Sequence, residues 1–523
     1  MKTPGVYIVE KSAFPNSVVE APTAIPAFIG ITEKAQNGAD SLIGKPWKIT
    51  SMTEFQQYFG GAPDQKFTLA VADKDKAKAS LYSIPSLDGK KVLQVIAPKN
   101  LYSLYYQMVM FYANGGGTCY IVSMGTYAEG NPVDKEKVTA ALSALEKEQE
   151  ITMVVVPEAA FVSDCKDIQT QVLAHCGKMM NRFAILDVQP KKEVNETMDK
   201  QIETFRTNVG ANFLSYGAVY YPWLNTSVLS DKDIDGSVLA WASGTSPDGF
   251  FPEDSKLLKY FNEVMDTING TVALTAPEGE AKTEEETASA GQTAVTLSDN
   301  EIAAMKNNLH NALLQNFPGY QYIVNKVREN LNLLPPSAAM AGLYTMVDNT
   351  RGVWKAPANV SVNYVNSPTE NIDNAMQEDL NMPMNGKAVN AIRTFPGEGI
   401  KVWGARTLDG NSQDWRYVNV RRTMMFLEES VKNAAKAYVF EPNVAATWMN
   451  VRSMIDNFLR SVWKRGGLAG ATPEEAYEIH VGLGDTMTAN DILDGIMRIT
   501  VLVAITRPAE FIEITFQQQM QKS

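Results

Sequence analysis

Strand–helix–strand alternation between residues 118 and 224 constrains the fold of this chain more than any other feature of its sequence. The runs ITMVVVP (151–157) and RFAILDV (182–188) have the length and apolar composition of strands buried on both faces. Such strands, separated by segments with helical periodicity, predict a mostly parallel sheet with helices on its faces. The predicted order is strand 118–124, helix 133–149, strand 151–157, helix 164–180, strand 182–188, helix 196–209 and strand 215–223.

A parallel sheet raises the possibility of an enzyme, because ligands of such sheets bind beyond the carboxyl ends of the strands. The residues expected at that edge are Pro157, Glu158, Asp187 and Pro190. A phosphate cradle needs glycines between a strand and the next helix, whereas the glycines at 115–117 precede a strand. We therefore predict that these residues are structural and that the chain has no catalytic residue. A nucleotide-binding α/β enzyme is the alternative.

Cysteine and histidine residues are few and scattered. The three cysteines are Cys119, Cys165 and Cys176, an odd number that does not suggest a disulfide framework. His175 beside Cys176 supplies at most half of a zinc site, because zinc takes about four ligands. We predict that the protein binds no metal and no cofactor.

Charge and hydropathy exclude several classes of protein. The net charge of −12 argues against general nucleic-acid binding, and no run of about 18 apolar residues predicts membrane insertion. The N-terminus lacks a signal-peptide pattern, so we expect synthesis in the cytoplasm. Residues 401–470 nevertheless carry eleven Lys or Arg against six Asp or Glu, a net of +5 that leaves −17 for the rest. This asymmetry predicts one basic face on an acidic molecule.

Two segments have the composition of exposed insertions. Residues 274–299 carry six acidic residues against one lysine and few large apolar residues, which predicts a solvated outer loop. Residues 60–99 are also polar and predict an exposed insertion.

Helical periodicity returns in the C-terminal quarter. Residues 421–440 and a segment ending at Gly466-Gly467 read as two helices with apolar stripes. Glu428 with Lys432, and Asp456 with Arg460, are spaced as i, i+4 ion pairs on their outer faces.

Both ends of the chain have strand-like sequences. Residues 5–9, GVYIV, are apolar, and residues 509–521 alternate between apolar and polar side chains. A terminal strand must pair with something, because its backbone N–H and C=O groups are otherwise open. It could pair beside IMRITVLVAI (496–505) in the same chain or add to a sheet of another molecule, and the residues alone do not decide.

A series of ordered segments carries a family resemblance. In chain order they are PGVYIVE (4–10), AIPAFIGITE (24–33), LLPPSAAMAGLYTMVDNTRGVWKAPAN (333–359), FPGEGIKVWGARTL (395–408), WRYVNVRRTMMFLEESV (415–431), FEPNVAATW (440–448), WKRGGLAGATPEEAY (463–477) and RPAEFIEI (507–514). Together they resemble the contractile tail sheath family of phage tails, tailocins and extracellular contractile injection systems. The resemblance is strong over 333–516 and weak between about 60 and 330.

The resemblance implies a structural function. Sheath subunits assemble around an inner tube in an extended, metastable state, and contraction drives the tube through a target envelope. The implied partners are other copies of the chain, the inner tube protein, baseplate proteins and tail terminator or cap proteins, within a phage tail or injection particle. A type VI secretion sheath is an alternative, although its sheath is split between two chains and this chain carries both terminal signatures.

The resemblance also implies roles for particular residues. The terminal arms would complete small sheets of neighbouring copies through Val6, Tyr7, Ile8, Val9, Phe511, Ile512, Ile514 and Phe516. The C-terminal domain would face the tube, so some of the following candidate cations are expected to face it: Arg416, Arg421, Arg422, Lys432, Arg452, Lys464 and Arg465.

Residues 335–359 read as a rigid joint between domains. Pro335 and Pro336 fix the entry of the segment, Asp348 to Gly352 supply turn residues that include Arg351, and Trp354 would anchor against the C-terminal domain. The predicted fold class is α/β, α+β overall, in a multidomain subunit with outer insertions. Its expected parts are an N-terminal arm and start of the core (1–33), a variable outer region (34–115), a middle α/β domain (116–330), a connecting segment (331–394), a C-terminal α/β core (395–510) and a C-terminal arm (511–523).

Overall fold

A large mixed sheet forms the centre of the computed structural model, which describes residues 18–76, 80–191, 195–242, 245–252, 255–275 and 297–515. Within these residues the sheet has nine strands. In spatial order they are β15 (Val360–Ser361), β18 (Gly399–Val402), β17 (Asn390–Phe395), β11 (Gly217–Tyr221), β10 (Phe183–Asp187), β9 (Met153–Val155), β1 (Pro26–Thr32), β8 (Cys119–Thr126) and β4 (Trp47–Ile49). The strands from β17 to β8 are mutually parallel. At the edges, β18 pairs antiparallel with β17, β15 with β18, and β4 with β8. The predicted α/β class is confirmed.

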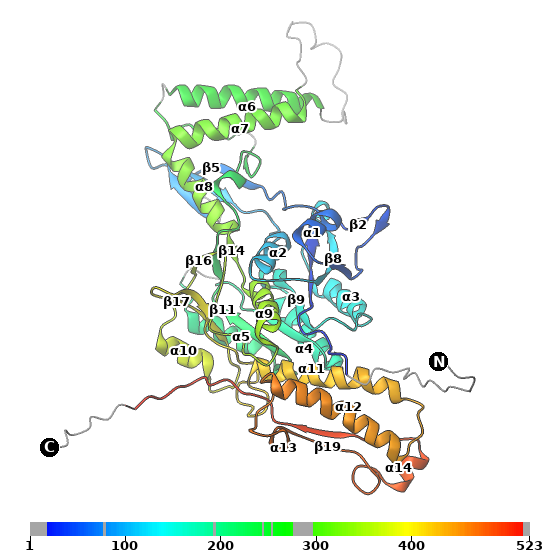
Figure 1. Cartoon of the computed structure of the whole chain (residues 1–523). Coiled ribbons are helices and arrows are strands. Elements are labelled where there is room, and N and C mark those ends of the chain that lie inside the picture. The colour runs from blue at the N-terminus through cyan, green and yellow to red at the C-terminus, as the bar shows by residue number, and fades with distance from the viewer. Residues whose placement is uncertain are drawn as a thin grey trace, which may run out of the picture.

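Helices cover both faces of this sheet, as Figure 1 shows. On one face, α3 (Lys135–Leu145), α4 (Cys165–Met179) and α5 (Met198–Asn208) share a core with Ala27, Ile29 and Ile31 of β1. Phe28 points to the other face, where α2 (Leu104–Ala113) and α9 (Ser337–Arg351) complete a second core. Because side chains alternate along a strand, β1 contributes to both cores. It pairs with β8 and β9 inside the sheet, third from the β4 edge, a place that its sequence did not indicate.

The predicted turn at 348–352 is wrong. Residues 348–351 form the last turn of α9, and the helix ends at Gly352, whose φ of 91° favours glycine. Small residues allow α9 to lie close to α2, since a Cβ on Gly342 would come 2.4 Å from the carbonyl oxygen of Phe111. Burial of this helix face outweighs the turn preference of Asp348 and Asn349.

A separate outer domain lies at one end of the molecule, at the top of Figure 1. Its sheet has the order β13 (Leu239–Trp241), β5 (Phe67–Asp73), β7 (Lys91–Ile96) and β6 (Tyr82–Pro85). The helices α6 (Lys256–Thr275), α7 (Asp299–Asn316) and α8 (Pro318–Leu331) pack on it around a core of their own. Residues 60–99 are therefore not simply an exposed insertion, because Phe67, Leu69, Leu93 and Val95 are fully buried. Most of the acidic segment 274–299 lies outside the described residues, between α6 and α7.

The C-terminal unit consists of α11 (Val418–Ala435), α12 (Ala445–Lys464), α13 (Pro473–Ala476), β19 (Tyr477–His480), α14 (Ala489–Leu493) and β20 (Thr500–Val503). Its core forms between the two long helices and the two strands. The Asp456–Arg460 pair is present at 3.4 Å, but Lys432 contacts Glu429 at 2.8 Å instead of Glu428. The Glu428–Lys432 prediction is wrong because the i, i+3 carboxylate lies closer to the ammonium group.

Several predicted boundaries cross elements of the structure. The boundary between 394 and 395 falls inside β17, and residues 34–115 divide between the central sheet and the outer domain. Pairing between strands that are distant in sequence decides where these segments lie, and local sequence patterns do not predict such pairing.

The remaining strands and α-helices are β2 (Gln36–Asn37), β3 (Asp40–Ser41), α1 (Met52–Phe59), β12 (Leu224–Thr226), β14 (Leu333–Leu334), β16 (Val365–Pro368) and α10 (Asn374–Asn381).

None of the described helices combines the length and the apolar character that crossing a membrane requires.

Candidate assembly surfaces

Residues 504–510, after the last strand, lie along the body of the protein, and residues 511–515 are exposed. After β20, Ala504 and Thr506 form backbone hydrogen bonds with Ala476, Ala469 and Gly467. The side-chain amide of Asn419 on α11 donates to the Thr506 carbonyl at 3.1 Å. Four residues later the chain reaches Glu510, whose carboxylate lies against the central sheet unit.

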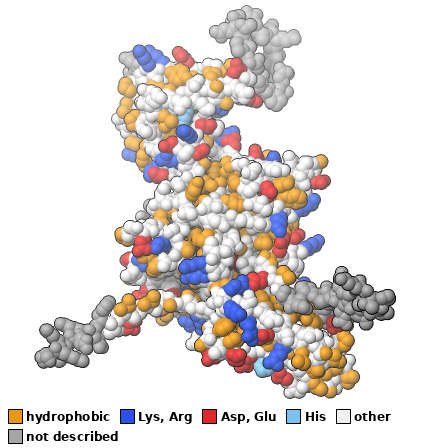
Figure 2. Space-filling model, viewed as in Figure 1, with side chains coloured by type: hydrophobic (Ala, Val, Ile, Leu, Met, Phe, Trp, Pro, Cys, Tyr) orange, Lys and Arg blue, Asp and Glu red, His pale blue; other side chains and the backbone are white. Residues whose placement is uncertain are grey.

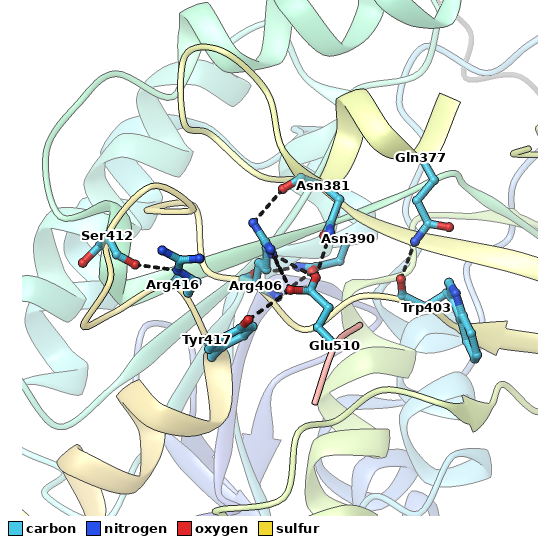
Figure 3. A network of polar contacts seen from close by, with 9 residues as sticks. All are labelled: Gln377, Asn381, Asn390, Trp403, Arg406, Ser412, Arg416, Tyr417 and Glu510. Carbon is cyan, nitrogen blue, oxygen red and sulfur yellow. Dashed lines mark hydrogen bonds and ion pairs between the residues drawn. The ribbon is translucent and has the colours of Figure 1, made fainter. Parts of the chain in front are cut away.

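Three side chains converge on the Glu510 carboxylate (Figure 3). Arg406 donates from Nε to Oε1 at 3.0 Å and from Nη2 to Oε2 at 2.6 Å. Tyr417 donates its hydroxyl proton to Oε2 at 3.0 Å, and the Asn381 side-chain amide donates to Oε1 at 2.7 Å. We call Glu510, Arg406, Tyr417 and Asn381 the Glu510 clamp. Its Arg406 residue is 2% exposed, so a two-point ion pair is held largely away from water.

The electrostatic environment keeps Glu510 ionised. Burial pushes the pKa of this carboxyl upward, but the hydrogen bonds from Arg406 and Asn381 and the nearby guanidinium outweigh it, so the pKa lies below its ordinary value. Burial, together with the same carboxylate, raises the pKa of Tyr417. The Glu510 carboxyl is therefore ionised at neutral pH.

The depressed pKa of Glu510 predicts how the clamp depends on pH. The carboxylate binds fewer protons folded than unfolded, so its stabilisation is complete above about pH 4.5 and is lost as the pH falls through the folded pKa. Glu510→Gln should lower the unfolding free energy by about 1 to 3 kcal/mol at pH 7, the usual range for hydrogen bonds to charged groups. The difference between variant and wild type, followed by thermal unfolding, should shrink at acid pH. A difference that is constant from pH 7 to pH 3 would contradict this assignment.

The segment after the clamp is exposed. Over residues 511–515 the chain has no regular secondary structure, and it runs away from the body in Figure 1. The side chains of Phe511, Ile512 and Ile514 are 70, 78 and 69% exposed. The strand predicted at 509–521 is thus not formed within this chain over the described residues. Phe516 and the four apolar residues Val6, Tyr7, Ile8 and Val9 lie outside them.

A second arginine holds the start of the described chain. Arg422 on α11 donates from Nη1 and Nη2 to the Asp348 carboxylate on α9, at 2.9 and 2.6 Å. Its Nη2 also donates to the Thr23 carbonyl at 2.9 Å, and the Ala21 amide donates to Ser430 Oγ on α11 at 2.9 Å. Residues 20–25 therefore lie between the central sheet unit and the C-terminal helices.

Two of the cations expected to face a tube are buried instead. Arg422 is 4% exposed in the Asp348 pair, and Arg421 is 6% exposed with its guanidinium between the rings of Tyr216 and Trp415, at 3.9 and 4.5 Å. These two candidates are therefore not accessible to a tube in this structure. Sequence reasoning placed charged residues on the surface by default and could not anticipate these ring and carboxylate partners.

The other expected cations are more accessible. Arg416 is half-buried and donates from Nε to the Ser412 carbonyl, whereas Lys432, Arg452, Lys464 and Arg465 are exposed. Arg465 pairs with Glu20 and lies over the Trp354 ring. Arg460, which pairs with Asp456, lies between Arg452 and Lys464 along α12. Figure 2 shows Lys and Arg side chains gathered over the region of α11 and α12.

The predicted joint residues lie at the two ends of α9 and just beyond its C-terminal end. Pro336 precedes α9, and Arg351 is exposed in its last turn. Trp354 packs against the C-terminal core, and its carbonyl accepts a hydrogen bond from Asn419 at 2.8 Å. A Cβ on Gly352 would lie 2.5 Å from the Trp354 ring, so the ring also requires glycine at this position.

The sheet of the C-terminal unit is small. Strands β19 and β20 pair antiparallel and form a two-stranded sheet, without a third strand in the described part of the chain. Its inner face packs on the C-terminal core, whereas Leu502 is half exposed. Two-stranded sheets are marginal alone and present open backbone edges to another strand.

The carboxylates weighed for an enzyme site have structural partners. Glu158 follows β9 and accepts hydrogen bonds from the amides of Ile31, Ser103 and Leu104, at 2.9, 2.8 and 3.1 Å. Asp187 ends β10 and accepts from the Ser337 amide at 2.9 Å. Burial raises the pKa of each carboxyl to about 7. They bind the N-terminal ends of α2 and α9, where helix dipoles favour carboxylates.

The possible metal ligands are likewise not clustered. His175 Nε2 accepts a hydrogen bond from buried Arg182 at 2.9 Å, and burial lowers the pKa of His175 to about 4. No group of three or more potential metal ligands occurs within the described ranges.

Comparison with family models matches two adjoining parts of the chain. Residues 249–408 match "Phage tail sheath protein central domain", and residues 411–519 match "Phage tail sheath C-terminal domain". Curated relatives include a tail sheath protein of Vibrio phage KVP40, 24% identical over 34% of this chain and 25% of the relative. A tail sheath protein of Salmonella phage ViI is 25% identical over 34% of this chain and 28% of the relative. The matches thus span about a quarter of these relatives.

Solved structures resemble the whole chain. The sheath complex of an extracellular contractile injection system, PVC, in its contracted state is 26% identical, with a TM-score of 0.60 over 99% of this chain and 98% of that chain. The helical sheath of the anti-feeding prophage in its contracted state is 25% identical, with a TM-score of 0.58 over 99% and 100%.

Proposed function

The chain belongs to the contractile tail sheath family, and from this premise we propose that it is the structural subunit of a contractile sheath. Copies polymerise around an inner tube in an extended state and contract to drive the tube through a target envelope. The partners are other copies, an inner tube, a baseplate and a terminator or cap protein. The particle is a phage tail, tailocin or injection system, made in the cytoplasm of a bacterium.

One observation carries this proposal: the chain has an exposed apolar arm and, elsewhere, a small sheet with open edges. Phe511, Ile512 and Ile514 have little cover from their own chain, and β19–β20 has only two strands among the described residues. Strand addition between copies satisfies both features, because main-chain hydrogen bonds complete the sheet and the apolar residues become buried. A contact of this kind, repeated from copy to copy without closing, produces a helical assembly.

The contraction step needs no bound nucleotide in this proposal. The extended and contracted states are two packings of nearly rigid subunits, and the arms keep neighbours connected while the bodies slide and rotate. Free energy stored at assembly as unmade lateral contacts is released along the tube. We therefore propose that the chain is not an enzyme, in keeping with the structural partners of Glu158 and Asp187.

The tube-facing surface is proposed to include the exposed ridge of α12. Arg452, Arg460 and Lys464 follow one another along this helix, at intervals of eight and four residues that keep them near one face. Such a ridge complements acidic groups on a tube and would steer the two together.

Charge reversal of this ridge should weaken assembly on the tube. We expect Arg452→Glu, Arg460→Glu and Lys464→Glu together to abolish growth on tubes at physiological salt, because attraction becomes repulsion. The control changes the net charge equally through Lys147→Glu, Lys166→Glu and Lys200→Glu, all exposed and outside α12. Co-sedimentation with tubes measures the difference. Equal binding by the two triple variants would remove α12 from the tube-facing surface.

The test of the overall function is whether the protein assembles. Purified full-length chain, alone or with its tube protein, should form hollow striated cylinders in negative-stain micrographs, in a long and a short form. A purified chain that stays monomeric and binds a nucleotide tightly would instead favour the enzyme alternative.

A further inference from the structure

The C-terminal arm leaves the body at a point separated from β20. Strand β20 ends at Val503, residues 504–506 follow the 467–469 loop, and the Glu510 clamp is the last fixed contact before exposed residues 511–515. Any pull on the arm therefore reaches Glu510 before it reaches β20.

The clamp connects the arm to the largest sheet of the molecule. The Arg406 amide donates to Asn390 Oδ1 at 2.7 Å, and the Asn390 side-chain amide donates to the carbonyls of Arg406 and Val219 at 2.8 and 3.1 Å. Asn390 begins β17 and Val219 lies in β11, so these bonds join Arg406 to two parallel strands of the central sheet. Figure 3 shows Asn390 beside the Arg406–Glu510 pair.

Strand β20 is poorly suited to carry a load itself. It has four residues and pairs only with β19 among the described strands. A pull on its C-terminal end would break its hydrogen bonds one after another, whereas the clamp must lose several bonds at once. A neighbouring arm is proposed to add to this small sheet. Loss of the sheet would therefore break both the attachment of the chain's own arm and the contact with the neighbouring arm.

We propose that the Glu510 clamp is a mechanical anchor that transmits the pull of a neighbouring copy into the central sheet and prevents the arm from peeling β20 off β19. This role rests on the proposed function, in which the arm is held by another copy. Glu510 and Arg406 act here as positioning residues. The start of the described chain is held in a similar way: the Thr23 carbonyl accepts a hydrogen bond from Arg422, which also pairs with Asp348.

Single-molecule pulling tests the anchor without any assembly. One handle is attached at the C-terminus and the other at Glu136→Cys, an exposed position on α3; the native cysteines are buried and should not react. In the wild type, the first extension should require rupture of the clamp. In Glu510→Ala, β20 and residues 504–510 should peel at a lower force and release roughly 35 Å of chain, at about 3.3 Å per residue.

The matched control is Glu513→Ala, which removes an exposed carboxylate three residues further along the arm. It should leave the first rupture force at the wild-type value. If Glu510→Ala is too unstable to study, Glu510→Gln keeps the side-chain volume, loses the ion pair and should shift the force in the same direction. Equal rupture forces for the Glu510 variant and the Glu513 variant would overturn the proposal.

A measurement on cylinders separates this inference from the proposed function. Cylinders of Glu510→Ala should break between rings on contraction, while those of Glu513→Ala contract intact. If the wild type never forms cylinders, the proposed function fails, and the pulling result still decides whether the clamp protects β20. If cylinders of the Glu510 variant contract intact and its rupture force is unchanged, only the anchor is rejected.

Discussion

A chain that ends at Glu510 should remain folded and form no cylinders. The deletion of residues 511–523 leaves the clamp and both core units in place, because residues 511–515 make no regular structure with their own body. It removes the exposed Phe511, Ile512 and Ile514, which strand addition would bury in a neighbouring copy. We expect an unchanged thermal unfolding profile, and negative-stain micrographs with monomers or short oligomers only.

A point variant makes the same test without shortening the chain. Ile512→Pro removes a backbone N–H and should block the added strand, while Ile512→Val keeps both the N–H and the strand preference and should assemble. Deletion of residues 1–12 examines the other arm, whose structure lies outside the described residues. Cylinders of normal length that still shorten, formed by the chain ending at 510, would reject the exchange of arms.

Loss of the Arg422 guanidinium should be the most destabilising single change among the charged residues discussed above. Asp348 is 8% exposed, and Arg422→Met removes the cation that its carboxylate binds through two hydrogen bonds. Leaving a buried charge unpaired in this way typically lowers the unfolding free energy by about 3 to 5 kcal/mol. It also removes the hydrogen bond to the Thr23 carbonyl and so loosens residues 20–25. Urea unfolding should reveal an earlier transition, and hydrogen exchange should rise in α9, α11 and residues 20–25.

Two comparisons give this prediction its controls. Arg452→Met removes an exposed arginine from α12 and should change the unfolding free energy by less than about 0.5 kcal/mol. Arg422→Met combined with Asp348→Leu replaces the buried pair by apolar groups and should recover much of the loss. If the double variant is as unstable as Arg422→Met alone, the uncompensated carboxylate is not the cause.

Local sequence patterns determined which short segments form strands and which faces of the helices are buried. The apolar runs at 151–157 and 182–188 became β9 and β10, and Val138, Ala141, Leu142 and Leu145 form the buried face of α3 as their spacing predicts. Strand length and helical periodicity are properties of neighbouring residues, so the parallel sheet could be predicted. The ordered family segments likewise identified the sheath family, which the comparisons confirm.

Partners distant in sequence were decided only by the tertiary structure. Strand β1 inserts between β8 and β9, and β17 adds to β11 from a segment about 170 residues further along the chain. Residues 335–359 read as a stiff joint with a turn, but burial against α2 and the central sheet makes most of them a helix. Local propensity is weak compared with the apolar area that such contacts remove from water.

The sequence by itself determined that this chain has a parallel α/β core, strand-like ends and a basic C-terminal region. It did not determine what its charged residues do, because the side chain that neutralises a buried charge can lie anywhere in the chain. Arg422 meets Asp348 across 74 positions and Arg406 meets Glu510 across 104, so both arginines become internal ties. Only folding brings those carboxylates within hydrogen-bonding distance, and that proximity offsets the cost of taking the charges out of water.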